Sequence, residues 1–410
     1  MFIPVGGQNV RARRLLLTLS LVVALTAGFA APAPARARPG TVAVFLDGLP
    51  VDFDVQPVIR NNRTLVPFRA VAEALNVEVA WDGATRTVSA TDGKNSIRLQ
   101  IGNRIAYRNG TPIVLEAPAT IIAGRTLIPL RFFGEAFGCQ VAWDDAAYRA
   151  LITSPRRQMT VGGFYALGDG KTSSWTNLLG RAYPETATGN TDAVDLLALG
   201  WYSLDAEGNL LTRSRTGWQR PDGWEKVLAA AEKYELKTEM VVHVTDEDGT
   251  ITSLLNDTTA MNRAVRAIVH EAELYHGVNL DFEGLGWQDR GEQLVAVRDR
   301  FTGFVRLLSD QLKPAGRALT LTLHAPNSVY RGYDYRALGA LADRIIVMAY
   351  DYGPTPEPVD MVLQAVEKAK ADVPAAKLSL GISVPRETPQ SLPAKVGIAK
   401  RYGLDGIALW

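Results

Sequence analysis

The chain has 410 residues, a length that suits two or three domains rather than one. Hydrophobic residues make up 47% and charged residues 21%, so the chain can bury large cores. The net charge of +1 gives no field that would indicate binding to nucleic acid. The single cysteine, Cys139, excludes an internal disulfide framework. The four histidines begin at His243 and form no pair with ligand spacing, so the sequence predicts no metal site and no cofactor.

The first segment of the chain has the composition of an export signal. Arg11, Arg13 and Arg14 precede an apolar run over residues 15–31, and Ala/Pro-rich sequence follows. A basic region, an apolar core and a small-residue exit are typical of a secretory signal. We therefore expect residues 1–37 to be a signal peptide and the protein to be secreted or associated with the cell wall. An uncleaved membrane anchor is the alternative, because the run is only slightly shorter than the ~20 residues that span a bilayer.

Residues 41–155 contain an internal repeat, in which residues 63–82 match residues 125–144 and share Arg, Pro, Glu and Trp. Each copy predicts a strand, a proline, a short amphipathic helix (68–75 in the first copy) and an alternating strand, followed by a turn and another strand. The pattern predicts a small α+β module of two related halves. We interpret the shared Arg, Glu and Trp as packing and turn residues in preference to a ligand surface.

This repeat resembles the N-terminal domain of copper amine oxidases, a stalk module of exported proteins in Gram-positive spore formers. The resemblance implies a spacer or a contact with the bacterial cell wall. It implies no copper chemistry, because residues 41–155 contain no histidine.

Residues 158–410 alternate short apolar strands with amphipathic helices. Eight strands in about 250 residues match the count and length of a (β/α)8 TIM barrel. A doubly wound open sheet is the alternative, but no Gly-rich phosphate turn follows the first strand. The predicted strands cover residues 159–166, 193–202, 238–244, 277–282, 319–324, 344–350, 377–384 and 406–410, and the predicted helices cover 223–234, 258–275, 299–312, 335–341, 359–371 and 394–402.

The fourth predicted strand carries the candidate chemistry. Its alternation places Asn279, Asp281 and Glu283 on one face, which is the lumen of a barrel. Glu283 comes last, at the carboxyl end of the strand, where the active sites of barrels form. Burial of these groups is costly unless they satisfy one another or serve a function. A hydrogen-bonded structural cluster is therefore the alternative interpretation.

Two other strand ends favour the functional interpretation. Tyr350 and Asp351 end the sixth predicted strand, and Trp410 ends the eighth. Carboxyl groups, a tyrosine and an aromatic plate at strand ends are typical of a sugar-binding site. Tyr165 on the first strand is a further candidate to flank the sugar, with packing inside the barrel as its alternative role.

These motifs in this order resemble glycoside hydrolase family 18, especially its spore-germination and cortex-lytic branch. The family pattern Asp-x-x-Asp-x-Asp-x-Glu aligns with His276, Asn279, Asp281 and Glu283, and its Met-x-Tyr-Asp with residues 348–351. His276 has the parity that points away from the lumen. Asn279 cannot take up a proton, and loss of a negative neighbour should lower the pKa of Asp281. The Ser-x-Gly-Gly of the third strand is missing.

The resemblance implies retaining, substrate-assisted hydrolysis of glycans that contain N-acetylglucosamine. Glu283 is then the general acid, Asp281 orients the acetamido N–H, and Tyr350 binds the acetamido oxygen. The alternative is a non-catalytic, lectin-like barrel that binds wall glycan. The sequence leaves open peptidoglycan or chitin as the substrate, endo- or exo-action, the oligomeric state and a truncation after the last residue. The residues assigned to substrate binding are Asn279, Asp351, Trp410 and Tyr165.

Overall fold

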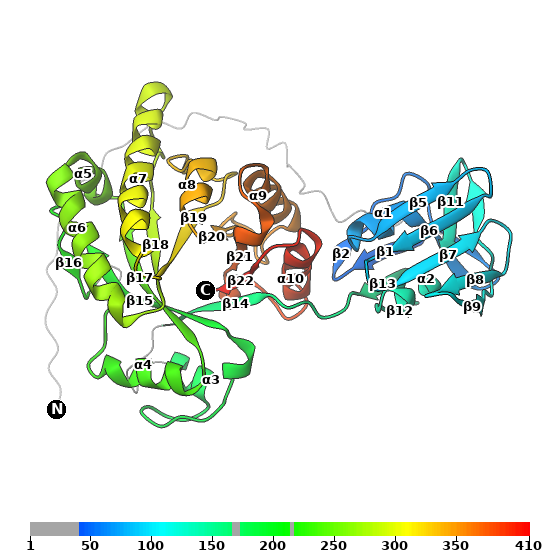
Figure 1. Cartoon of the computed structure of the whole chain (residues 1–410), viewed down its shortest axis with the longest axis horizontal. Helices are drawn as coiled ribbons and strands as arrows, with labels where there is room; N and C mark the ends of the chain where they lie inside the picture. The colour runs from blue at the N-terminus through cyan, green and yellow to red at the C-terminus, as the bar shows by residue number, and fades with distance from the viewer. Residues whose placement is uncertain (1–40, 166–172, 214–216) are drawn as a thin grey trace, which may run out of the picture. The chain divides into compact units, whose positions relative to one another are not determined.

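The computed structural model describes residues 41–165, 173–213 and 217–410 (Figure 1). The expected signal peptide, residues 1–37, lies outside the described residues. In the part of the chain that is described, no helix has the length and apolar character needed to cross a membrane.

The N-terminal module has the duplicated α+β structure that the repeat predicts. In each copy a proline, Pro67 or Pro129, directly precedes the helix and ends the strand, because a proline has no N–H for the strand ladder. The equivalent strands β4 and β11 pair antiparallel and join the two copies. The first copy comprises β4 (Arg63–Pro67), α1 (Phe68–Ala74), β5 (Glu78–Asp82) and β6 (Thr87–Thr91), and the second β11 (Arg125–Pro129), α2 (Leu130–Ala136), β12 (Gln140–Asp144) and β13 (Arg149–Thr153).

The module's other strands complete three sheets. The strand orders are β10-β11-β4-β3, β12-β13-β1-β2 and β5-β6-β7-β8-β9. The pairing of β1 with β13 is parallel, whereas β6 to β9 form an antiparallel meander (Figure 1). These strands are β1 (Ala43–Leu46), β2 (Leu49–Pro50), β3 (Val58–Arg60), β7 (Ser96–Gln100), β8 (Ile105–Arg108), β9 (Thr111–Val114) and β10 (Thr120–Ile122).

The second part of the chain is a TIM barrel. Its strands run in the order β14-β22-β21-β20-β19-β18-β17-β15, all parallel, and β14 also pairs with β15, which closes the sheet. The prediction of a barrel is confirmed, and the open doubly wound sheet is wrong. The strands are β14 (Thr160–Tyr165), β15 (Leu196–Leu204), β17 (Lys237–Thr245), β18 (Gly277–Glu283), β19 (Ala318–His324), β20 (Arg344–Met348), β21 (Leu378–Ile382) and β22 (Gly406–Leu409), with β16 (Leu210–Leu211) antiparallel to the end of β15.

The helices follow the prediction in most places. The helix expected over 299–312 begins earlier, at Gly291, and Leu294 and Val297 continue the apolar stripe of Phe301 into its first turns. Two helices of seven residues each were not predicted, although a third of the same length, over 335–341, was. The helices are α3 (Ser173–Leu179), α4 (Trp224–Lys233), α5 (Thr250–Asn256), α6 (Thr258–Glu271), α7 (Gly291–Leu312), α8 (Tyr335–Leu341), α9 (Val359–Asp372) and α10 (Leu392–Arg401).

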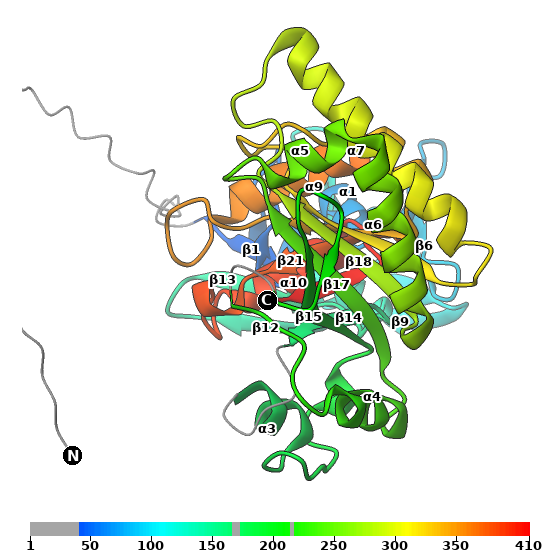
Figure 2. The same ribbon diagram turned by 90° about the vertical axis from the view of Figure 1, so that its left-hand side faces the viewer.

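Packing outside the barrel fixes which side chains of β18 face the lumen. Helices α5, α6 and α7 lie side by side on the outer surface (Figures 1 and 2). The buried ring of Phe282 stacks at 5.6 Å from that of Phe304 on α7, and Val278 and Leu280 join the same core. Because side chains alternate along a strand, Asn279, Asp281 and Glu283 must face inward.

The connection between β13 and β14 generates a prediction about folding units. Residues 154–159 have no regular secondary structure, and Arg156 and Arg157 are exposed. Most buried apolar residues of the module and of the barrel belong to separate clusters. We therefore expect trypsin to cut first after these arginines and to leave two compact pieces that contain residues 41–155 and 158–410, detectable by mass spectrometry. Resistance of both arginines while other sites are cleaved would contradict this boundary.

Candidate active site

Glu283 lies at the carboxyl end of β18 between two histidines from the neighbouring strands. His243 on β17 has its Nε2 3.2 Å from Glu283 Oε1, and His324 at the end of β19 has its Nε2 3.5 Å from Oε2. Burial alone would raise the pKa of Glu283, but the hydrogen bond from His243 and the charge of His243 lower it. Glu283 is therefore held as a carboxylate in the free protein.

The two histidines differ in protonation. Burial would lower the pKa of His243, but its bond to Glu283 and the nearby Asp281 charge raise it, which favours the charged ring. In His324, Nε2 accepts a hydrogen bond from the Gly284 N–H at 3.3 Å, so this nitrogen carries no proton. Burial lowers the pKa of His324, consistent with a neutral ring, and the ring stacks on Tyr330 at 4.0 Å.

Asp281 is the most isolated acid of the site. Its side chain is 2% exposed, and Oδ1 has no hydrogen-bond partner among the described residues. Burial and the adjacent Glu283 charge raise the pKa of Asp281 well above its usual range. The expected lowering of this pKa by Asn279 is relative to an acid at that position, and it stays a prediction; burial and Glu283 set the direction of the shift from the usual value. The pair thus favours one proton, held on Asp281.

Below this pair the lumen contains a row of polar side chains. The Thr322 hydroxyl donates to Asn279 Oδ1 at 2.8 Å, and the Thr320 hydroxyl donates to Glu239 Oε1 at 2.7 Å. Burial raises the pKa of Glu239, and the guanidinium of Arg344 opposes this. Asn279 is therefore a hydrogen-bonded neighbour of the site and lies entirely buried.

Tyr350 lies with the acidic pair, whereas Asp351 does not. Burial and the charges of Asp281 and Glu283 raise the pKa of Tyr350 well above its usual value. Gly381 on the next strand leaves room for its ring, since a Cβ there would lie 3.2 Å from the ring. The Asp351 side chain is 70% exposed, and its Oδ1 lies 3.4 Å from Arg386 Nε.

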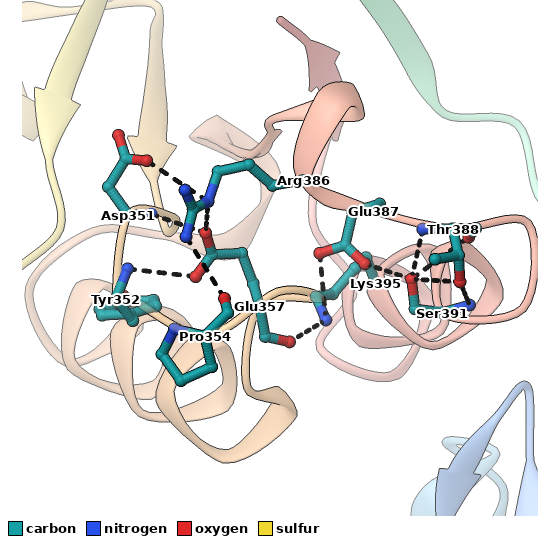
Figure 3. Close-up of polar contacts among 9 residues, drawn as sticks. All are labelled: Asp351, Tyr352, Pro354, Glu357, Arg386, Glu387, Thr388, Ser391 and Lys395. Atoms are coloured by element: carbon teal, nitrogen blue, oxygen red, sulfur yellow. Dashed lines mark hydrogen bonds and ion pairs between the residues drawn. The ribbon is translucent and has the colours of Figure 1, made fainter.

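A buried carboxylate holds the loop that follows Tyr350 (Figure 3). Glu357 accepts hydrogen bonds from the backbone N–H of Asp351 at 2.9 Å and of Tyr352 at 3.1 Å, and its carboxylate pairs with Arg386. Lys395, also buried, donates to the Glu357 carbonyl at 2.6 Å. Because these bonds fix the backbone directly after Tyr350, they position its side chain.

Trp410 lies at the end of β22 and is 42% exposed. Its ring is stacked with Trp218 at 5.2 Å and meets the edge of Phe164 at 5.1 Å. The residue of β14 whose ring contacts Trp410 is thus Phe164. Tyr165, the next residue, was the one predicted to flank the sugar with Trp410. Tyr165 itself is half-buried, and burial raises its pKa.

Glu283 opens onto a cavity of about 590 Å3. Tyr330 and Trp287, whose side chain is 55% exposed, supply aromatic surfaces to its wall, and Asp246 and Asp289 supply acids. A concave site with a few polar groups and aromatic walls is suited to a sugar ring.

Several residues around Glu283 were not predicted from the sequence. His243 lies near the carboxyl end of the third strand of the barrel, and His324 ends the fifth. Because the active sites of barrels form at the carboxyl ends of strands, that position could have marked both histidines as candidates. Trp218 and Trp287 lie on loops, where no local periodicity marks a residue as functional.

Comparisons with known proteins match the two parts separately. Residues 45–152 match the family described as the copper amine oxidase N-terminal domain. The chain is 35% identical over 141 residues to a provisionally named sporulation-specific glycosylase, YdhD, of Bacillus subtilis (strain 168), a match that covers 32% of each chain. It is 30% identical over 150 residues to the cortical fragment-lytic enzyme of the same organism, covering 33% of this chain and 32% of that protein. The chain thus spans about a third of the length of these relatives.

A solved structure shows the same barrel fold. The class V chitinase from Pseudomonas fluorescens Pf-5 superimposes with a TM-score of 0.50 at 20% identity, over 62% of this chain and 95% of that one. The match over residues 45–152 confirms the resemblance of the N-terminal repeat to the copper amine oxidase N-terminal domain, and the barrel that follows shares its fold with this chitinase.

The Glu357 cluster generates a prediction about stability. Glu357→Ala leaves two backbone donors and Arg386 without their carboxylate, so the free energy of unfolding should fall by at least about 3 kcal/mol. Asp351→Ala is the matched control, because Asp351 pairs with the same arginine at the surface and should cost less than ~1 kcal/mol. Urea unfolding measures both. Equal losses would contradict the role given to the buried carboxylate.

Proposed function

We propose that the barrel is a glycoside hydrolase that cleaves glycans containing N-acetylglucosamine by a retaining, substrate-assisted mechanism. The observation that carries the proposal is the pair of inward carboxyls at the mouth of the barrel. The nearest ligand atoms of Asp281 and Glu283 lie within 4.8 Å of one another, too close for the ~6.5–9.5 Å that an inverting enzyme needs for an intervening water.

In this mechanism Glu283 is the general acid that protonates the glycosidic oxygen. The free pair favours one proton, on Asp281, so the proton reaches Glu283 when bound glycan excludes water and weakens its interaction with the histidines. The acetamido oxygen of the substrate then attacks the anomeric carbon as the leaving group departs. Glu283 next acts as the base that activates water, which returns the proton to the enzyme.

The neighbouring groups stabilise the cyclic oxazolinium ion formed in between. Asp281 orients the acetamido N–H, and once ionised it balances the positive charge of the ion. Tyr350 donates to the acetamido oxygen, because its raised pKa keeps the phenol protonated. Such preorganised groups act strongly in a buried site, where water does not screen them.

The names of the relatives support a substrate and a location for this proposal. Two of them are named for sporulation or for cortical fragments, which favours peptidoglycan of the wall over chitin and a secreted or wall-associated protein. A lectin-like barrel is the second candidate, since Trp410 is 42% exposed and its ring could stack on a sugar.

Substitution of the acidic pair tests catalysis against binding alone. Glu283→Gln keeps the shape but cannot deliver a proton, so turnover should fall ~10²-fold or more while glycan binding persists. Asp281→Asn should also reduce turnover, and Tyr350→Phe should cost ~2–4 kcal/mol of transition-state stabilisation. Product analysis on cortex fragments and chitin oligomers measures these effects. A wild-type protein that binds glycan and shows no more cleavage than Glu283→Gln would favour the lectin.

The matched substrate control is an oligomer of unacetylated glucosamine. It lacks the oxygen that attacks the anomeric carbon, so the wild type should leave it uncut. Equal cleavage of both oligomers would exclude participation of the acetamido group while leaving hydrolysis itself in place.

In this proposal the module also contacts the wall, and the difference between its two equivalent tryptophans supports this. In the second copy the Trp143 N–H donates to Asp145 at 2.7 Å, and its ring meets Tyr148. Gly83 and Arg86 occupy those two positions in the first copy, so Trp81 stays 41% exposed. It lines a cavity of about 650 Å3 together with Phe68, Arg69, Glu73, Asp52, Asp54 and Arg125. An aromatic face beside charged groups suits a sugar ring.

The repeat supplies its own control for this contact. The chain has eight tryptophans, whose indole N–H signals can be followed in ¹⁵N-labelled Glu283→Gln protein and assigned with Trp81→Phe and Trp143→Phe. Addition of a glycan fragment of peptidoglycan should shift the Trp81 signal saturably and leave the Trp143 signal unmoved. A Trp81 signal that stays fixed while the Trp410 signal moves would contradict the module contact and leave the barrel proposal intact.

A further inference from the structure

His243, Asp281 and Glu283 form a group of mixed ligands at the mouth of the barrel. Each offers one atom, an imidazole nitrogen or a carboxylate oxygen, and the three atoms lie within 4.8 Å of one another. No local sequence pattern marks this group, because His243 and the two acids come from adjacent strands, β17 and β18. The register of the two strands places His243 opposite Asp281, which brings the three side chains together.

The geometry points to a binding site for a divalent transition-metal ion, of which Zn²⁺ is the best match, on His243, Asp281 and Glu283. One nitrogen and two oxygen ligands suit ions of intermediate softness, whereas Mg²⁺ and Ca²⁺ prefer oxygen alone. Ligands of one ion at ~2.1 Å lie roughly 3.4 Å apart in a tetrahedron. The 3.2 Å between His243 Nε2 and Glu283 Oε1 already fits that spacing.

Asp281 supplies the independent reason to expect a ligand. Its side chain is 2% exposed, and its Oδ1 lacks a hydrogen-bond partner in the described part of the chain. A buried, unpaired carboxylate oxygen is costly, and a bound cation satisfies it. Binding of the ion releases the protons of Asp281 and of the His243 Nε2 to the solvent, and the ion then balances the charge of the two carboxylates. Three protein ligands leave the fourth position of a tetrahedral ion open to water or substrate.

Such an ion acts as a reversible inhibitor, and this part of the inference rests on the proposed hydrolase function. An ion bound to the Glu283 carboxylate occupies the oxygen that must deliver the proton. Because Asp281 also binds the ion, it can no longer orient the acetamido N–H of the substrate. Metal and productive substrate therefore exclude one another. A chelator that removes the ion restores both carboxyls.

Cobalt titration tests the site without reference to activity, because Co²⁺ replaces Zn²⁺ and gives visible absorption bands. The full chain should bind one Co²⁺ per molecule, and Zn²⁺ should displace it. His243→Ala and Asp281→Asn should each weaken binding by at least about tenfold, since loss even of an outer partner of a metal site costs ~10–100-fold. His270→Ala is the matched control: His270 is an exposed histidine on α6, 3.7 Å from Glu273, and its loss should change nothing.

The outcomes separate this inference from the proposed function. Thermal unfolding shows whether each variant is folded, and His243→Gln replaces His243→Ala if the latter is not. Absence of stoichiometric Co²⁺ binding, or binding that His243 and Asp281 substitutions leave unchanged, overturns the site even if the protein hydrolyses glycan. Cobalt binding that depends on these residues in a protein without hydrolase activity supports the site and contradicts the proposed function. Hydrolysis that Zn²⁺ inhibits and EDTA restores supports both.

Discussion

Two carboxyls on one face of a buried strand are the constraint around which this barrel is built. Asp281 and Glu283 are separated by one residue, so the alternation of β18 gives them the same direction. Phe282 between them packs into the outer helices and prevents the strand from rotating. Both acids are thereby forced into the lumen, where two like charges in contact are unfavourable.

The surroundings resolve this conflict by making the two acids unequal. His243 donates to Glu283 and favours its ionised form, whereas Asp281 has no such donor among the described residues and favours its neutral form. When the surroundings of two similar acids push their pKa values apart, one acid can hold a proton while the other is ionised, and the two can take different roles in catalysis. The loop of Tyr350 is fixed separately by Glu357 and Arg386. The hydrogen-bonding groups around a bound acetamido group would therefore be in place before substrate arrives.

The sequence predicted the fold well because its signals are local. The eight strands of the barrel, the two halves of the module and the inward parity of Asn279, Asp281 and Glu283 all follow from apolar periodicity over a few residues. The start of α7 was placed too late, although Leu294 and Val297 continue its apolar stripe ahead of Phe301. Of the two candidates at the end of the sixth predicted strand, Tyr350 lies with the acidic pair as expected. Asp351 does not, because its side chain turns to the surface and pairs with Arg386.

The rest of the site depends on contacts between distant segments. The place of His243 near the end of its strand can be read from the sequence, but its contact with Glu283 depends on the register between the two strands. The partners of Trp410 are likewise set by a loop residue, Trp218, and by Phe164 on the first strand of the barrel. The direction of the Asp281 pKa also required the structure, because it is the degree of burial that decides it.

The stereochemistry of cleavage tests the central claim most directly. Close carboxyls and attack by the substrate's own acetamido oxygen require two inversions at the anomeric carbon, so the first product must keep the β configuration. Proton NMR during the first minutes of hydrolysis of an N-acetylglucosamine oligomer distinguishes the two anomers before they equilibrate. The account predicts that the β anomer is released first and the α anomer appears only by mutarotation. Initial release of the α anomer would contradict it.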